Sequence, residues 1–153
     1  LMNSDMENRE ILQLIKEQME NCLHPERVVF EIVEQDGIED YKYIAKFIEK
    51  IHTYGAKIAI DDFGTGYSNF EHILKLKPDY IKIDGSLVKN ILVDEKSKIL
   101  VKSIVEFSHA LKIKVIAEYV ETEEVFLVLK EIGVDEYQGY YFGKPTEFAK
   151  IPS

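Results

Sequence analysis

The chain of 153 residues has one cysteine, no long apolar run and no excess of basic residues. Because Cys22 has no second cysteine to pair with, an internal disulfide is excluded and a cysteine-rich zinc site is disfavoured. No apolar run approaches the roughly 20 residues that cross a bilayer, so we expect no membrane segment. Residues 1–10 are polar and acidic, unlike a signal peptide. We therefore expect a cytoplasmic protein.

The charge balance limits the possible partners. The formal net charge is -9 and the isoelectric point is about 5.0, which argues against nucleic acid, because a groove for phosphates needs a basic stripe. A small phosphorylated ligand is compatible with this negative charge if metal ions supply positive charge locally. No stretch rich in proline, glycine or serine divides the chain, so we predict a single domain over residues 1–153.

Segments with the composition of buried strands alternate with segments of helical apolar spacing. The helical segments are 6–22, 44–51, 69–76, 94–111 and 122–132, and the strand segments are 27–33, 57–61, 79–84, 112–118 and 134–139. Strands that alternate with helices at this spacing are typical of βα units with a parallel sheet. We predict an α/β fold with about five parallel strands.

Polar side chains lie at or near the end of each predicted strand. They are Glu31, Asp61, Asp62, Lys82, Asp84, Glu118 and Gln138. The carboxyl ends of parallel strands meet at one edge of a sheet, so we expect these side chains to converge there. Barrel enzymes of the (β/α) type build their sites in this way.

The adjacent pair Asp61 and Asp62 is the most informative part of this set. A single acidic residue at a strand end commonly caps the next helix, but capping does not need two carboxylates. Neighbouring desolvated carboxylates repel each other, and Mg²⁺, Mn²⁺ or Ca²⁺ takes oxygen ligands of this kind. Lys82 lies within a strand that we expect to be buried, where an ammonium needs an anion. The pattern predicts a divalent metal site with Lys82 beside it.

Two other patterns indicate structure rather than chemistry. The Gly64–Gly66 turn lacks the lysine and the spacing of phosphate-binding loops, so we interpret it as a tight turn. The four histidines, His24, His52, His72 and His109, have no metal-ligand spacing. We expect these histidines on the surface or at helix ends.

Five segments together resemble the EAL-domain family. They are 30–34 (FEIVE), 61–68 (DDFGTGYS), 81–84 (IKID), 115–122 (VIAEYVET) and 138–145 (QGYYFGKP). Members of that family are bacterial cyclic di-GMP phosphodiesterases with a (β/α)₈ barrel, in which two divalent cations hydrolyse one phosphodiester to give linear pGpG. The resemblance implies a TIM-type barrel of which this chain would form the carboxyl-terminal five βα units.

The resemblance also implies roles for single residues. Glu31 would bind a first Mg²⁺ or Mn²⁺, Asp61 would bridge both ions, and Asp62 and Glu118 would bind the second. With Glu118, Lys82 and Gln138 would be the catalytic residues, through contact with the attacking water or its carboxylate partners. The remaining implied positions are Glu121 with Gly64, Thr65 and Gly66 as loop support, and Asp84 and Pro145 as substrate contacts.

The chain departs from the family pattern in two ways. The Glu-Ala-Leu segment, its nearby arginine and a metal-binding asparagine of the following strand are missing, and Tyr119 stands where the family has glycine. We therefore expect the separate fragment to bind metal weakly and to be inactive. We also expect a homodimer or domain swap through open barrel edges. The alternative is a degenerate module that binds cyclic di-GMP, or a protein partner, as a signalling receptor.

Overall fold

The computed structural model describes residues 8–33, 41–64 and 70–144. No helix in these ranges is both long and apolar enough to span a membrane. The elements in chain order are α2 (Arg9–Glu20), η1 (Pro25–Arg27), β1 (Val29–Val33), α3 (Tyr41–Thr53), β2 (Lys57–Phe63), α4 (Phe70–Leu76), β3 (Tyr80–Ile83), α5 (Gly85–Asn90), α6 (Glu95–Ala110), β4 (Lys114–Ala117), α7 (Glu123–Ile132) and β5 (Glu136–Tyr137).

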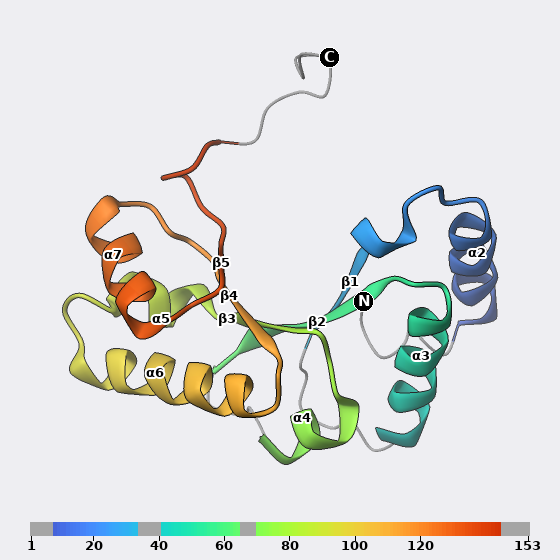
Figure 1. The fold of residues 1–153 in the computed structure, drawn as a ribbon, viewed down its shortest axis with the longest axis horizontal. Helices are drawn as coiled ribbons and strands as arrows, with labels where there is room; N and C mark the ends of the chain where they lie inside the picture. The colour runs from blue at the N-terminus through green and yellow to red at the C-terminus, as the bar shows by residue number, and fades with distance from the viewer. Residues whose placement is uncertain (1–7, 34–40, 65–69, 145–153) are drawn as a thin grey trace.

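The five strands form one parallel sheet in the order β1-β2-β3-β4-β5. Because the spatial order never reverses, right-handed crossovers place all the connecting helices on the same face of the sheet. Figure 1 shows the helices following one another around the strands, from α2 and α3 through α4 and α6 to α7. The predicted α/β architecture with five parallel strands is confirmed.

The core lies between the sheet and these helices. Alternate strand residues point to opposite faces of a sheet, and the residues on the helix side of β2, β3 and β4 are apolar and almost fully buried. These are Ile58, Ile60, Ile81, Ile83, Val115 and Ala117. Ile51 of α3, Ile104 of α6 and Leu129 of α7 are equally buried in the same cluster. Each of the buried isoleucine, leucine and valine side chains contributes about 1.5–3 kcal/mol of burial free energy, which fixes the register of the sheet.

Several boundaries differ from the sequence-based expectation. Strand β1 begins later than predicted because Pro25–Arg27 form a 3₁₀ turn. Strand β5 has only two residues. Helix α5 was not predicted: the side chain of Asp84 accepts a hydrogen bond from the Ser86 backbone N–H, and this cap starts a helix directly after β3.

Two aspartates tie helices to strands at the amino-terminal edge of the sheet. Asp79 Oδ2 accepts the Ile58 N–H at 2.8 Å and contacts His52 Nε2 at 2.9 Å.

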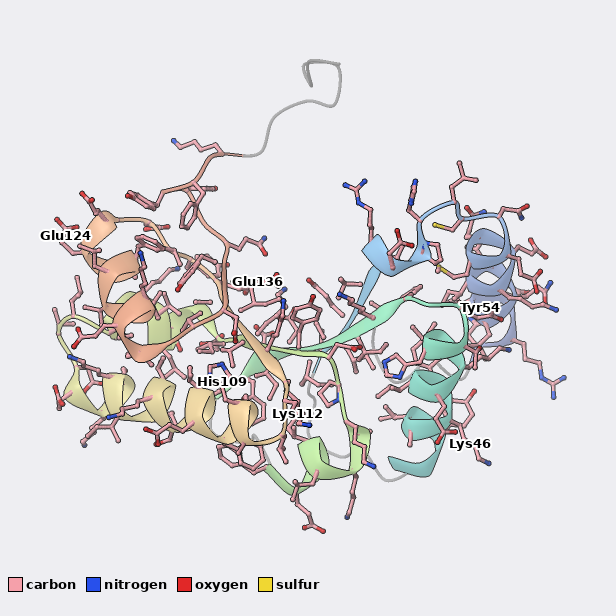
Figure 2. All side chains as sticks on the ribbon, in the orientation of Figure 1. Lys46, Tyr54, His109, Lys112, Glu124 and Glu136 are labelled. Atoms are coloured by element: carbon pink, nitrogen blue, oxygen red, sulfur yellow. The ribbon has the colours of Figure 1, made fainter. Side chains whose placement is uncertain are left out.

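The second aspartate repeats this arrangement with the same atoms. Asp135 Oδ2 accepts the Val115 N–H at 2.8 Å and contacts His109 Nε2 at 2.9 Å. His109 is labelled at the end of α6 in Figure 2, and His52 lies in the last turn of α3. The helix-end position expected for these two histidines is confirmed. We call each set of contacts, from one aspartate to a strand N–H and to a histidine, an aspartate–histidine clamp. Both clamps lie at the edge of the sheet opposite the polar strand ends.

Candidate metal centre

The adjacent aspartates lie in an irregular part of β2. Ile60 pairs with Ile81 and Phe63 pairs with Ile83, so β2 has one more residue than β3 between these pairs. This is a β-bulge, in which the extra residue turns a side chain to a new direction. Asp62 has φ 57°, a left-handed conformation that aspartate tolerates better than most residues. The bulge explains how neighbouring side chains, which would alternate in a regular strand, meet on one side.

Lys82 of β3 is the centre of the polar cluster. Its Nζ lies 2.7 Å from Glu118 Oε1, 2.9 Å from Glu31 Oε1 and 3.2 Å from Asp61 Oδ1. The Lys82 side chain is 5% exposed, whereas that of Glu31 is 49% exposed. Burial favours the neutral amine, but the hydrogen bonds to these three carboxylates outweigh it and raise the pKa of Lys82. Lys82 is therefore a cation at any physiological pH.

The carboxylates exceed the positive charge that Lys82 supplies. Oxygens of Asp61, Asp62 and Glu118 all lie within 4.8 Å of one another. Burial, followed by repulsion from Asp61 and Asp84, raises the pKa of Asp62. Clustered carboxylate oxygens at the end of a strand are suitable ligands for a hard divalent cation. The donor set thus fits a metal ion, in agreement with the acidic pair seen in the sequence.

Gln138 and Glu121 lie next to this cluster. Together with Glu118, Tyr119 and Tyr140 they line a cavity of about 260 Å³. The Gln138 backbone N–H donates to Ala117 O at 2.8 Å, which holds the segment after β5 against the end of β4. The structure therefore brings Gln138 beside Glu118, as the sequence predicted; the chemical roles stay predictions.

Tyr119 has a strained backbone and a packed ring. Its φ is 54°, a region that costs residues other than glycine about 1 kcal/mol. The ring lies so close to Gly85 of α5 that a Cβ added there would be 2.1 Å from Tyr119 Cδ2. Lys89 Nζ lies 3.9 Å from the ring centroid, a cation–π contact. These contacts join α5 to the residue directly after Glu118, and the sequence contained no signal for them.

The other predicted site residues are only partly described. Asp84 caps α5 through Ser86, and Gly64 has φ 107° beside Leu87, where a Cβ would approach Cδ1 to 2.5 Å. Thr65, Gly66 and Pro145 lie outside the described residues. The structure thus gathers Glu31, Asp61, Asp62, Lys82 and Glu118 at one place and leaves the loop and substrate contacts as predictions.

Comparisons with known proteins agree with this geometry. The family model described as EAL domain matches residues 1–145. The "Probable cyclic di-GMP phosphodiesterase PdeA" of Escherichia coli (strain K12) is 39% identical over 127 residues, which are 83% of this chain and 17% of that protein. The chain thus spans less than a fifth of the length of that curated relative.

Solved structures show the same similarity. A structure described as the EAL enzyme Bd1971 in its cGMP-bound form aligns with a TM-score of 0.88 at 32% identity, covering 98% of this chain and 40% of that one. Klebsiella pneumoniae BlrP1, in a manganese and cyclic di-GMP complex, aligns with a TM-score of 0.81 at 32% identity, covering 93% of this chain and 36% of that one. The predicted resemblance is therefore confirmed.

Proposed function

Because this chain belongs to the EAL domain family, we propose that it is part of a metal-dependent cyclic di-GMP phosphodiesterase in bacterial second-messenger signalling. The reaction is the hydrolysis of one phosphodiester bond of cyclic di-GMP to give linear pGpG. The observation that carries the proposal is the contact of the buried Lys82 ammonium with carboxylates of β1, of β2 and of the residue after β4. A carboxylate oxygen of Asp62 lies within 4.8 Å of those of Asp61 and Glu118.

Asp61, Asp62 and Glu118 are the residues that would hold Mg²⁺ or Mn²⁺, with Glu31 as a further ligand. Bound divalent cations would supply a water of lowered pKa and would stabilise negative charge on the attacking and leaving oxygens. Lys82 donates to Glu31, Asp61 and Glu118, which keeps these carboxylates oriented toward a common point. This preorganisation is the contribution of the chain itself.

Gln138 and Lys82 would act on the attacking water. The Gln138 amide lies on the wall that contains Glu118, where an amide can both donate to a carboxylate and accept from a water molecule. The Lys82 ammonium stays protonated and thus serves as a hydrogen-bond donor and not as a base. Substrate contacts of Asp84 and Pro145, and support of the loop by Glu121, Gly64, Thr65 and Gly66, belong to the same proposal.

We also propose how the barrel around the site is completed. In the part of the chain that the structure describes, β1 and β5 each have one strand neighbour, so each has an edge that another strand can extend. Association through these edges, as a homodimer or domain swap or with further strands of a longer chain, would complete the barrel. We expect metal binding by the separate chain to be weak, its turnover to be negligible, and the location to be cytoplasmic.

A receptor without turnover is the second candidate. The observation that favours it is Tyr119, whose ring packs on Gly85 and which lines the same cavity as Glu118. We infer that an aromatic residue on this wall changes how a nucleotide sits in the cavity and holds it out of line with the carboxylates. In that case cyclic di-GMP would bind and stay intact.

The experiment is a hydrolysis assay on the full-length protein that contains this chain, with Mn²⁺ or Mg²⁺ and separation of cyclic di-GMP from pGpG. We expect turnover by the wild type and a loss of at least ~100-fold for Asp61→Asn and Lys82→Met. Lys102→Met removes an exposed amine from α6 and is the matched control, with activity near that of the wild type. Full activity of Asp61→Asn would refute the metal site. Binding of cyclic di-GMP without hydrolysis would establish the receptor.

A further inference from the structure

A second cavity lies at the amino-terminal edge of the sheet, opposite the metal centre. Its volume is about 500 Å³, within the range of small-molecule sites. Its wall contains Lys57 at the start of β2, Lys77 after α4, Lys112 after α6 and Lys114 at the start of β4. Figure 2 shows Lys112 between the end of α6 and α4. Four cationic side chains from three separate segments thus gather around one hollow.

The acidic side chain on the wall of this cavity already has hydrogen-bond partners. Asp79 is the only acidic residue on the described wall, and its Oδ2 is bound to His52 and to the Ile58 N–H. Among the described residues, neither Lys77 nor Lys112 has a carboxylate within 4.0 Å. A chain with a net charge of -9 therefore has a local surplus of positive charge here.

The other two lysines are arranged around Tyr80. Lys57 Nζ donates to the Tyr80 hydroxyl at 3.2 Å, and this hydrogen bond raises the pKa of Lys57. Lys114 Nζ lies 6.0 Å from the Tyr80 ring centroid and 3.3 Å from Glu136 Oε1. The buried Tyr80 ring thus has two ammonium groups near it, one from each neighbouring strand, on the wall of the cavity.

Lysines at helix ends have an ordinary explanation, which covers only half of the set. A cation after the last turn of a helix compensates its dipole, and this accounts for Lys77 and Lys112. Lys57 and Lys114 lie on strands, where no helix dipole requires them. Tyr80 and Glu136 are partners of these two lysines, but they do not explain why four lysines gather around one hollow, whereas an anionic ligand does.

We propose that this cavity binds a chain of two or more phosphate groups, free or carried by a nucleoside. Lysine is a common point-charge partner of phosphate, and several lysines together match the charge of an oligophosphate. Apolar side chains of the wall, such as Leu74 and Pro78, offer a surface for the nucleoside of a nucleotide. The carboxylates at the opposite edge would repel the same anion. This site is independent of the proposed hydrolysis.

The test uses isothermal titration of the full-length protein with inorganic tripolyphosphate and, separately, with ATP, both without divalent metal. We expect binding that weakens as salt rises, and at least tenfold weaker binding for the double variant Lys77→Glu/Lys112→Glu. The charge-matched control is Lys96→Glu/Lys102→Glu on α6, away from the cavity, which should bind within twofold of the wild type. Tighter binding of ATP would assign a nucleotide, and equal binding would assign a free phosphate chain.

A second measurement on the wild type does not depend on the folding of a variant. Acetylation of lysines is followed by mass spectrometry with and without tripolyphosphate, and we expect protection of Lys77 and Lys112 but not of Lys96 and Lys102. Absence of binding by the wild type, equal loss in both double variants or uniform protection would each overturn the proposal. Asp61→Asn should leave tripolyphosphate binding unchanged even if it abolishes hydrolysis.

Discussion

The two edges of this sheet carry opposite charge patterns. At the carboxyl-terminal edge, Lys82 is surrounded by Glu31, Asp61 and Glu118. At the amino-terminal edge, Asp79 is the one acid among the described residues of a cavity wall with four lysines. At each edge the residue of the less common charge makes the short polar contacts. Lys82 contacts carboxylates, and Asp79 contacts His52 and a strand N–H. Parallel strands allow this sorting, because all of their like ends lie together.

The edges also differ in regularity. The carboxyl-terminal edge has the bulge in β2 and the left-handed residues Asp62 and Tyr119. The amino-terminal edge has the same aspartate–histidine clamp twice, at Asp79 and Asp135. Backbone irregularity of this kind is found at functional sites, because it re-aims side chains at a cost in stability. We expect the contacts of Asp79 and Asp135 to stabilise the sheet whose other edge carries the strain.

Removal of the Lys82 ammonium should have the largest effect. Lys82→Met leaves three carboxylates close together with little exposure for two of them, so we expect a loss of about 3 kcal/mol in the free energy of unfolding. Lys57→Met, which removes a partly buried amine and its hydrogen bond to the Tyr80 hydroxyl at the other edge, should cost only about 1 kcal/mol. Urea unfolding without metal measures both. Equal losses would contradict the difference between the edges, and added Mn²⁺ should restore part of the Lys82→Met loss.

The contact of Gly85 with Tyr119 gives a prediction confined to the irregular edge. Gly85→Ala should cost about 2 kcal/mol, because the added Cβ cannot fit beside the Tyr119 ring. In a Tyr119→Gly background the same change should cost less than about 0.5 kcal/mol, since the ring is gone and alanine favours the helix. A double-mutant cycle from urea unfolding measures the coupling. A coupling of zero would mean that the ring moves aside without cost.

The repeated clamps should be worth similar amounts. Asp79→Ala and Asp135→Ala each remove the acceptor of a strand N–H and the partner of a histidine, and we expect each to lower stability by about 1–2 kcal/mol. Glu106→Ala, which breaks an exposed ion pair with Lys102, is the control and should change stability by less than about 0.5 kcal/mol. Thermal unfolding ranks the three variants. A clamp no more costly than the control would show that the amino-terminal edge does not depend on it.

The smallest effect is expected for the repulsion at Asp62, and its sign depends on pH. The folded protein raises the pKa of Asp62 above the ordinary value of 3.8, so the ionised side chain opposes folding at neutral pH and the protonated one does not. Without metal, Asp62→Asn should therefore raise the melting temperature at pH 7 by about 2 °C. This gain should disappear as the pH falls below about 3.8. A gain that persists in acid would have another cause.

The order of strands and helices could be predicted from the sequence, because apolar residues recur at the spacing of a strand in the strands and at the spacing of a helix in the helices. Ile58, Ile60, Ile81 and Ile83 are apolar and lie at alternate strand positions, so they point to the same face of the sheet and are buried there. Helix α5 was missed, since six residues are too few for a periodic pattern, although Asp84 is an ordinary cap in retrospect. The core positions needed no knowledge of distant neighbours.

The sequence by itself determined which charged residues end the strands, since residue type and local pattern place Asp61, Lys82 and Glu118 there. Only the tertiary structure decided that Asp62 joins Asp61 on one side of the sheet, because the bulge depends on pairing with β3. It also placed the Tyr119 ring on Gly85, and it brought Lys57, Lys77, Lys112 and Lys114 around one cavity. These contacts join residues far apart in the chain, and their free energy exists only once the sheet has formed.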